Sequence, residues 1–279
     1  MKNRKLELIS GNIFTYLLLI IIAILTLFPL IWLFGTAFKP STDDISTTLT
    51  SWLPSQPTWQ NFIIVWQNYP FGKYLYNSFL IAFLTVCLNL ILCSLAAYPL
   101  ARINFLGKNT IWAFIISTIM IPSQIIMIPL FILAVNLKLR NTYLGAILPN
   151  LVSTFGIFFL RQAFKEVPKE LEEAAKIDGC SEFDIWWHIM IPAVRPALVT
   201  LAFFIFIGSW SDFLWPLIVL DNLDYYTLPL GIAKLANSLD LDWRLISAGS
   251  IISIIPVILL FILVQQYIIP TESGSGVKG

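Results

Sequence analysis

Long stretches without a charged residue alternate with short polar segments along this chain. Residues 11–38, 74–101, 109–137, 141–160 and 245–271 contain no Asp, Glu, Lys or Arg. About 20 apolar residues in a row are enough for a helix to cross the roughly 30 Å of hydrocarbon in a bilayer. The pattern therefore predicts transmembrane helices.

A sixth apolar run, residues 197–219, is interrupted only by Asp212. We therefore expect an all-α membrane protein with six transmembrane helices. The expected spans lie at about residues 13–34, 74–101, 109–137, 141–160, 197–219 and 245–271, flanked by a terminal segment at 1–12 and a tail at 272–279. The first run is longer than the apolar region of a signal peptide and has no small-x-small cleavage site, so we interpret it as an uncleaved helix.

The positions of Lys and Arg predict how the spans are oriented. Eleven of the 17 basic residues lie in the two termini and in residues 102–108 and 161–195, and the other six lie in the loops of the opposite side. Cytoplasmic loops carry the excess of basic residues. Both termini are therefore expected in the cytoplasm, whereas the loops at 41–70 and 221–244 face outward.

Composition narrows the function. The chain is 58% hydrophobic and 12% charged, against a charged fraction of about 25% in soluble domains. The net charge of +1 indicates no nucleic-acid partner. We find no phosphate-binding loop, no hydrolase or metalloprotease motif and no paired Cys-x-x-Cys. We therefore expect no catalytic residue, no cofactor and no metal site.

The longest polar segment, residues 161–195, carries 12 of the 33 formal charges. Pro168 suits the start of a helix, and Gly179 is expected to end that helix. Ser181 and Asp184 have the spacing of an N-cap pair for a second helix, which Pro192 and Pro196 are expected to interrupt. The segment thus predicts two short helices joined by a glycine hinge.

One face of the first short helix combines small and polar side chains. Leu171, Ala174, Ala175 and Asp178 follow the i, i+3, i+4, i+7 spacing. The two alanines would let another backbone approach closely. Composition alone is equally consistent with an ordinary solvated loop helix.

The order of residues in this segment resembles a known family motif. Glu173-Ala174-Ala175 is followed by Gly179 and, after nine intervening residues, by Ile189-Met190-Ile191-Pro192. This closely resembles the EAA loop of binding-protein-dependent ABC importer permeases, with Ile191 where the family usually has Leu. Residues 208–216 (GSWSDFLWP) and 276–279 (GVKG) resemble the carbohydrate, maltose-type branch.

The resemblance implies a type I importer permease (MetI-like) topology in the bacterial inner membrane. It also implies a dimer of ATPase subunits, a second related permease chain, an extracytoplasmic solute-binding protein and a carbohydrate substrate. The residues it assigns to the ATPase-coupling loop are Glu173, Ala174, Ala175, Asp178, Gly179, Ile189 and Pro192. The loop at 221–244 is the expected contact for the solute-binding protein, although a plain linker would look the same.

Asp212 is the one ionisable residue inside a predicted span, and such residues are functional candidates because a charge in lipid is costly. Trp210 and Trp215 flank it, and aromatic rings can stack on sugar faces. Asn150 and Gln124 are further polar candidates for the translocation pathway. The alternatives are that Asp212 reaches interfacial water, that the tryptophans form an interfacial belt and that the amides, with Asn89, bridge helices.

A self-contained secondary transporter or channel is the rival function, and a membrane scaffold is a third. Coupled carriers place carboxylates or broken helices near the bilayer midplane, often in repeated halves. Here the predicted midplane is almost free of charge and no internal repeat is evident. Neither rival requires the spacing found in residues 173–192.

Overall fold

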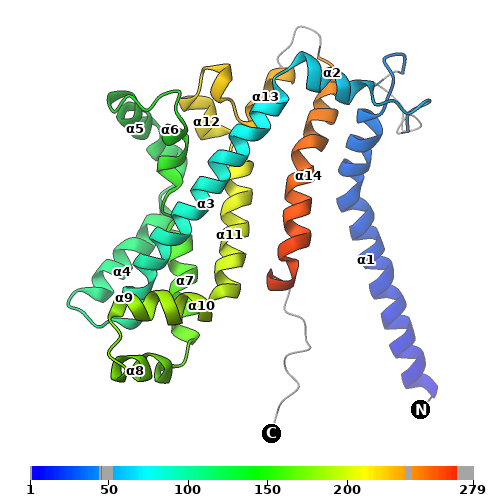
Figure 1. Cartoon of the computed structure of the whole chain (residues 1–279). Coiled ribbons are helices and arrows are strands. Elements are labelled where there is room, and N and C mark those ends of the chain that lie inside the picture. Colours follow the sequence, from blue (N-terminus) through cyan, green and yellow to red (C-terminus); the bar gives the residue numbers. More distant parts are fainter. Residues whose placement is uncertain (1, 44, 46–52, 237–240, 269–279) are drawn as a thin grey trace. The chain divides into compact units, whose positions relative to one another are not determined.

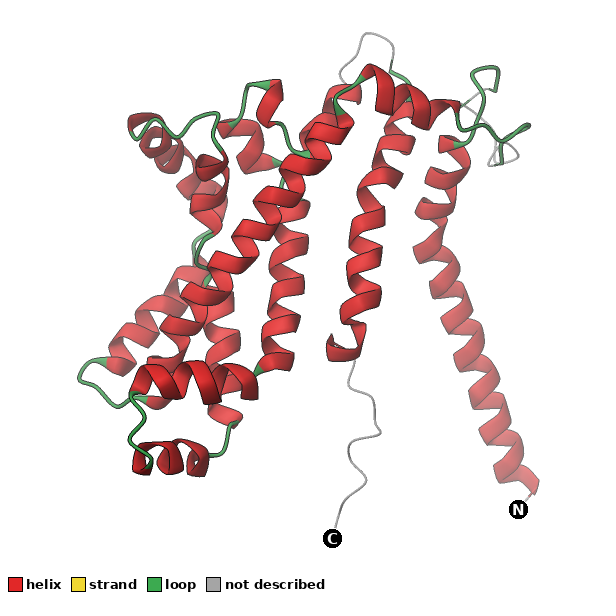
Figure 2. Cartoon of the chain, in the orientation of Figure 1, coloured by secondary structure: helices red, strands yellow, loops and turns green. Residues whose placement is uncertain are grey.

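The computed structural model describes residues 2–43, 45, 53–236 and 241–268, with side chains from Thr15 onward, and within these ranges it contains helices and loops but no strand (Figures 1 and 2). The first elements are α1 (Lys2–Ala37), α2 (Gln60–Asn68), α3 (Phe71–Arg102), α4 (Lys108–Ser117), η1 (Thr118–Met120) and α5 (Ser123–Asn136). Next come α6 (Tyr143–Ile147), η2 (Leu148–Asn150), α7 (Thr154–Glu166), α8 (Lys169–Ile177), α9 (Glu182–Asp184), η3 (Ile185–Met190) and α10 (Ile191–Ala193). The last are α11 (Arg195–Trp210), α12 (Leu214–Val219), η4 (Leu223–Tyr225), α13 (Leu228–Ala236) and α14 (Trp243–Ile268). The all-α prediction is confirmed.

Three of the predicted spans are continuous helices. In the described part of the chain, Thr15–Ala37 of α1, α3 and α14 are each long and apolar enough to cross a membrane. Each contains a proline, at Pro29, Pro99 and Pro256, without ending there. Residues 269–271 of the last predicted span and the tail at 272–279 lie outside the described residues.

Two other predicted spans are bent pairs of helices, in which Lys108–Met120 and Ser123–Asn136 meet at 98° and Tyr143–Asn150 and Thr154–Glu166 at 51°. A third bent pair, Glu182–Ala193 and Arg195–Trp210 at 79°, breaks before the predicted span at 197–219 begins. Pro122 precedes α5 and has no N–H to continue a helix, and the Ser153 side chain caps α7 afresh. Residues 211–213 also separate α11 from α12. Six spans result only if each bent pair counts as one.

The chain forms two compact units. Unit 1 comprises the residues up to Phe71 together with 232–254, and unit 2 comprises 72–231 together with the residues from Ile255 onward. In unit 1 the buried Asn61 amide donates hydrogen bonds to the carbonyls of Ala37 and Lys39, both at 2.8 Å. Asn61 thereby satisfies carbonyls left free at the end of α1, as helix termini require.

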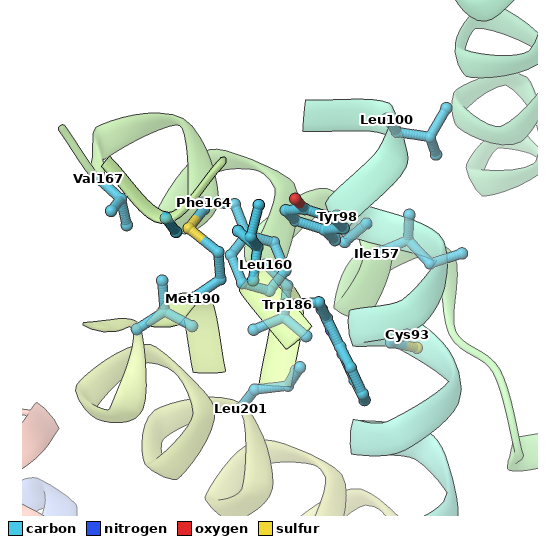
Figure 3. Close-up of a cluster of buried hydrophobic side chains, with 14 residues drawn as sticks. Cys93, Tyr98, Leu100, Ile157, Leu160, Phe164, Val167, Trp186, Met190 and Leu201 are labelled. Carbon is cyan, nitrogen blue, oxygen red and sulfur yellow. The ribbon is translucent and has the colours of Figure 1, made fainter. Parts of the chain in front are cut away.

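Unit 2 holds the polar segment on an apolar core. Figure 3 shows Tyr98 of α3, Leu160 and Phe164 of α7, and Trp186 and Met190 of η3 packed together. Leu160, Phe164 and Met190 are fully buried. The second short helix of the polar segment is therefore part of the core of unit 2.

Candidate functional site

The first short helix of the polar segment, α8, forms as its sequence predicts. It begins directly after Pro168, with acidic residues in its first turn and Lys176 in its last, so its charges complement the helix dipole. Gly179 ends it with φ of +84°, a left-handed conformation that glycine adopts without steric cost. The predicted glycine hinge is thus present.

The second short helix begins with the predicted N-cap pair. The Ser181 hydroxyl accepts a hydrogen bond from the Asp184 N–H at 3.2 Å, and the Asp184 carboxylate accepts one from the Ser181 N–H at 3.1 Å. The expected interruption by Pro192 and Pro196 falls between the two prolines, because helical structure continues through η3 and α10 to Ala193 and bends by 79° before α11 begins at Arg195. The π-helical turn η3 already departs from the α-helical hydrogen-bond ladder just before Pro192, so the missing N–H is accommodated there. Pro196 lies in the first turn of α11.

Replacing Ser181 with Ala should loosen the start of the second short helix. The substitution removes one acceptor from an exposed capping box, and N-cap losses of this type cost about 1 kcal/mol. We expect faster hydrogen–deuterium exchange at residues 182–185 with unchanged exchange in α8. Ser181→Asn retains a capping oxygen and should keep the wild-type rates. Equal exchange in Ser181→Ala and wild type would contradict the role of the cap.

A buried ion pair joins α8 to the end of α3. Arg102 Nε lies 2.8 Å from Glu172 Oε1, and the two side chains are only 6% and 11% exposed. The Arg102 guanidinium also donates to the carbonyl of Val167. Burial raises the pKa of the Glu172 carboxyl, and the charge of Arg102 opposes that rise. Sequence analysis missed this pair because its partners are distant along the chain.

A second set of polar contacts fixes the hinge. Lys176 before the hinge pairs with Glu182 after it at 2.8 Å, and the Tyr98 hydroxyl of α3 donates to the other oxygen of Glu182 at 2.7 Å. The hydrogen bond to Glu182 raises the pKa of Lys176. Arg161 of α7 donates from Nε to the Leu100 carbonyl at 3.0 Å. Both short helices are therefore tied to the carboxyl end of α3.

The structure separates the predicted coupling residues into exposed and buried ones. Glu173, Ala174, Asp178, Gly179 and Pro192 are exposed, Ile189 is half-buried and Ala175 is buried. Ala174 and Ala175, which were expected to let another backbone approach closely, therefore differ in exposure, since Ala175 packs into the core of unit 2.

Sequence analysis also missed an exposed apolar residue beside the hinge. Ile177 is 87% exposed at the end of α8. Its position between charged neighbours in the sequence carries no signal that distinguishes it from a core residue.

Of the residues predicted for the translocation pathway, two line a cavity and the others do not. Asp212 and Asn150 line a polar cavity of about 320 Å³ in unit 2. Trp210 and Trp215 are 3% and 5% exposed, and the Trp215 indole N–H donates to the Gly145 carbonyl at 2.9 Å. Both rings thus pack inside this chain. Gln124 lies exposed at the start of α5 and is not among the residues that line the cavity.

Asn89 of α3, for which sequence analysis favoured helix bridging, is fully buried and donates from Nδ2 to the carbonyl of Asn150 at 3.0 Å. That bridging role is confirmed. The bond holds the end of η2 against α3 at the edge of the cavity.

An all-helical chain with long apolar spans, broken helices and a polar segment fixed to the core is typical of membrane transport subunits. Residues 89–273 match the model of the family described as "Binding-protein-dependent transport system inner membrane component". The chain belongs to this family, as the resemblance of residues 173–192 indicated.

Relatives of known sequence and solved structures agree with this family assignment. The arabinooligosaccharides transport system permease protein AraQ of Halalkalibacterium halodurans is 39% identical over 260 residues, which cover 92% of this chain and 93% of that protein. The sulfoquinovosyl glycerol transport system permease protein SmoH of Agrobacterium fabrum is 30% identical over 97% of this chain and 95% of its own length. A chain of a bacterial ABC transporter that imports the acidic polysaccharide alginate has the same fold, with a TM-score of 0.83 at 24% identity and coverage of 92% of this chain and 96% of that one.

Proposed function

We propose that this chain is a transmembrane permease subunit of an ATP-driven importer for a carbohydrate. The names of its relatives support the cargo class, and the family supports binding-protein dependence. Under this proposal residues 13–271 form a six-span domain in the bacterial inner membrane, counting each bent pair once, with both termini in the cytoplasm. A second, related permease chain completes the translocation pathway.

The observation that carries the coupling part of the proposal is the exposed apolar tip of α8 on a rigid support. Ile177 and Ala174 are open to solvent, while Ala175 and Glu172 on the same helix are buried in unit 2. At the end of a firmly held helix, the exposed Ile177 is available for contact with a protein partner. The resemblance of residues 173–192 to the EAA loop implies that this partner is a dimer of ATPase subunits, and this chain has no nucleotide-binding motif of its own.

Within this coupling loop, residues 161–195, the exposed Glu173, Ala174, Asp178 and Gly179 are proposed to meet the ATPase. Ile189 and Pro192 are proposed to set the direction in which the coupling loop leads back into the membrane. Ala175 is proposed to hold α8 in place by packing against the core of unit 2. Motion of the ATPase pair would then pass through the contacts of Arg102 and Tyr98 to α3 and rock the spans between inward-open and outward-open states. The loop at 221–244 is the proposed contact for a solute-binding protein.

The test is co-purification from native membranes with a tagged chain, comparing wild type with Gly179→Asp. We expect an ATPase subunit to accompany the wild type and to be lost from the variant. Gly107→Asp is the matched control, because Gly107 has the same φ of +84° and, like Gly179, nothing within 4 Å of an added Cβ. The backbone φ and the introduced charge are the same in the two variants, but the carboxylate at Gly107 lies at the N-terminus of α4, where the helix dipole favours it, and at Gly179 it follows the C-terminus of α8.

An intact wild-type preparation without any ATPase would refute the importer function. A self-contained secondary transporter or channel would then be tested by uptake into vesicles that contain this chain alone. Equal loss of the ATPase from the Gly107 and Gly179 variants would refute the docking role of α8 but leave the importer function standing.

A further inference from the structure

The polar cavity of unit 2 forms where two helix breaks meet. Asn150 ends η2 and Ser153 lies in the break between η2 and α7, whereas Ser209 lies in the last turn of α11 and Asp212 in the break that follows it. Inside a membrane, irregular backbone is tolerated where it is buried in protein or lines an aqueous cavity. The volume of about 320 Å³ falls within the range of about 300–1,000 Å³ typical of small-molecule sites.

The wall combines apolar side chains, Val152, Phe204 and Ile205, with hydroxyls, amides and one carboxylate. Thr85 and Asn89 of α3 complete the polar lining, and no Lys, Arg or His is among the lining residues that the structure describes. The cavity therefore offers many hydrogen-bonding groups and a single negative charge with no cation to balance it.

Thr85 points to a ligand for this cavity. It is 1% exposed, and its hydroxyl has no hydrogen-bond partner among the described residues. A buried hydroxyl without a partner is unfavourable, so natural structures usually supply one. A ligand that brings its own hydroxyl groups into the cavity would supply it with only a small adjustment of the wall.

Asp212 keeps part of its acceptor capacity. Its Oδ1 accepts a long hydrogen bond from the Trp215 N–H, at 3.4 Å, and the Asn150 side chain and the Leu214 N–H also donate to the carboxylate. A carboxylate has about four lone-pair positions on its two oxygens. About one position therefore remains for a hydroxyl of a sugar ring.

We propose that this cavity is a substrate subsite contributed by this chain itself, and that it takes a neutral polyhydroxylated ring and disfavours a carboxylated, sulfonated or phosphorylated one. The expectation that the ligand is a sugar rests on the proposed function. The preference for a neutral ligand follows from the residues of the cavity alone. Like charges repel more strongly where water is scarce. Family membership does not decide whether the substrate is neutral or acidic. One relative is named for arabinooligosaccharides, whereas a structural neighbour is described as importing an acidic polysaccharide.

The charge preference can be measured with thiol reagents and without knowing the cargo. Ser209→Cys places a thiol on the cavity wall of the full chain in native membranes. We compare its rates with trimethylammonioethyl and sulfonatoethyl methanethiosulfonate, each normalised to free cysteine and read from the labelled peptide by mass spectrometry. The Asp212 carboxylate attracts the positively charged trimethylammonioethyl reagent and repels the negatively charged sulfonatoethyl reagent. We therefore expect the cationic reagent to react about tenfold faster.

Adding Asp212→Asn should bring that ratio to about one, while keeping the side-chain volume and an acceptor for the Trp215 N–H. A ratio near one with Asp212 present, or a ratio that Asp212→Asn leaves unchanged, would overturn the charge preference. Failure of both reagents to react would overturn the cavity itself as a binding site, because a sugar ring is no smaller than these reagents.

Ligand binding is read as protection of the same thiol in the complex that co-purifies with this chain. We expect millimolar arabinotriose or lactose to slow labelling several-fold, trigalacturonate to have no effect, and Thr85→Val to weaken the protection. Thr85→Val conserves shape, so unchanged protection would exclude the Thr85 hydroxyl from the site. Absence of protection by both neutral sugars, or equal protection by trigalacturonate, would overturn the proposal. Presence or absence of the ATPase in the same preparation reports separately on the proposed function.

Discussion

Replacing Arg102 with Met is expected to destabilise unit 2 by about 3–5 kcal/mol, the usual result of removing one partner from a buried ion pair. The loss arises because Glu172, whose side chain is 11% exposed, is left without the guanidinium 2.8 Å away. The Val167 carbonyl loses a donor at the same time. The measurement is the unfolding of the purified chain in mixed micelles against denaturing detergent.

The pH dependence of this variant has a definite sign. Burial already raises the pKa of Glu172, and removing Arg102 takes away the charge that opposes the rise. A carboxyl whose folded pKa exceeds its unfolded pKa binds more protons in the folded state, so its destabilising effect grows as pH rises between the two values. The deficit of Arg102→Met should therefore be larger at neutral pH than near the ordinary pKa of a glutamate.

Two further variants test whether the loss in Arg102→Met comes from the buried, unpaired charge. The double change Arg102→Met with Glu172→Leu replaces both charges by apolar groups and should recover much of the lost stability. Lys73→Met is the matched single change at an exposed pair, where Lys73 and Asp224 are 48% and 65% exposed, and it should cost no more than about 1 kcal/mol. Equal losses for Arg102→Met and Lys73→Met would refute the importance of burial at the first pair.

The sequence predicted the elements that depend on local rules. The charge-free runs gave the long helices α1, α3 and α14, because span length and composition are properties of a single segment. Gly179 and the Ser181–Asp184 pair ended one short helix and began the next as expected, because capping involves residues within one turn.

What could not be predicted depends on contacts between distant segments. The bend at Ser153 falls four residues after Pro149 of η2, and the Asn89 amide of α3 and the cap of α7 stabilise it at that place. The burial of Ala175 but not Ala174 is decided by the direction from which α8 meets the core. The cavity around Asp212 likewise requires α3 and two helix breaks to come together, and periodicity along one segment cannot show this.

Replacing Gly145 with Ala is expected to cost several kcal/mol, at or above the upper end of the usual 1–3 kcal/mol for overpacking. An added Cβ would lie 2.1 Å from the Leu139 carbonyl oxygen, a backbone atom that cannot swing aside. The Gly145 carbonyl is also the acceptor for the Trp215 indole N–H. A shift of α6 to relieve the clash would therefore disturb Trp215, which is buried in a cluster with Ile81, Ile147 and Val219.

The control for this change is Gly208→Ala, since nothing lies within 4 Å of a Cβ added at Gly208 in the helix α11. In a helix interior Ala is favoured over Gly by about 0.8–1.0 kcal/mol, so this variant should equal or exceed the wild type. Tryptophan fluorescence of the purified chain gives a second reading, because displacement of α6 exposes the Trp215 indole and shifts its emission to longer wavelength. If Gly145→Ala keeps the wild-type emission and unfolding midpoint, the turn at Leu139 can move aside without a cost in stability. The close packing of α6 would then contribute little to the stability of unit 2.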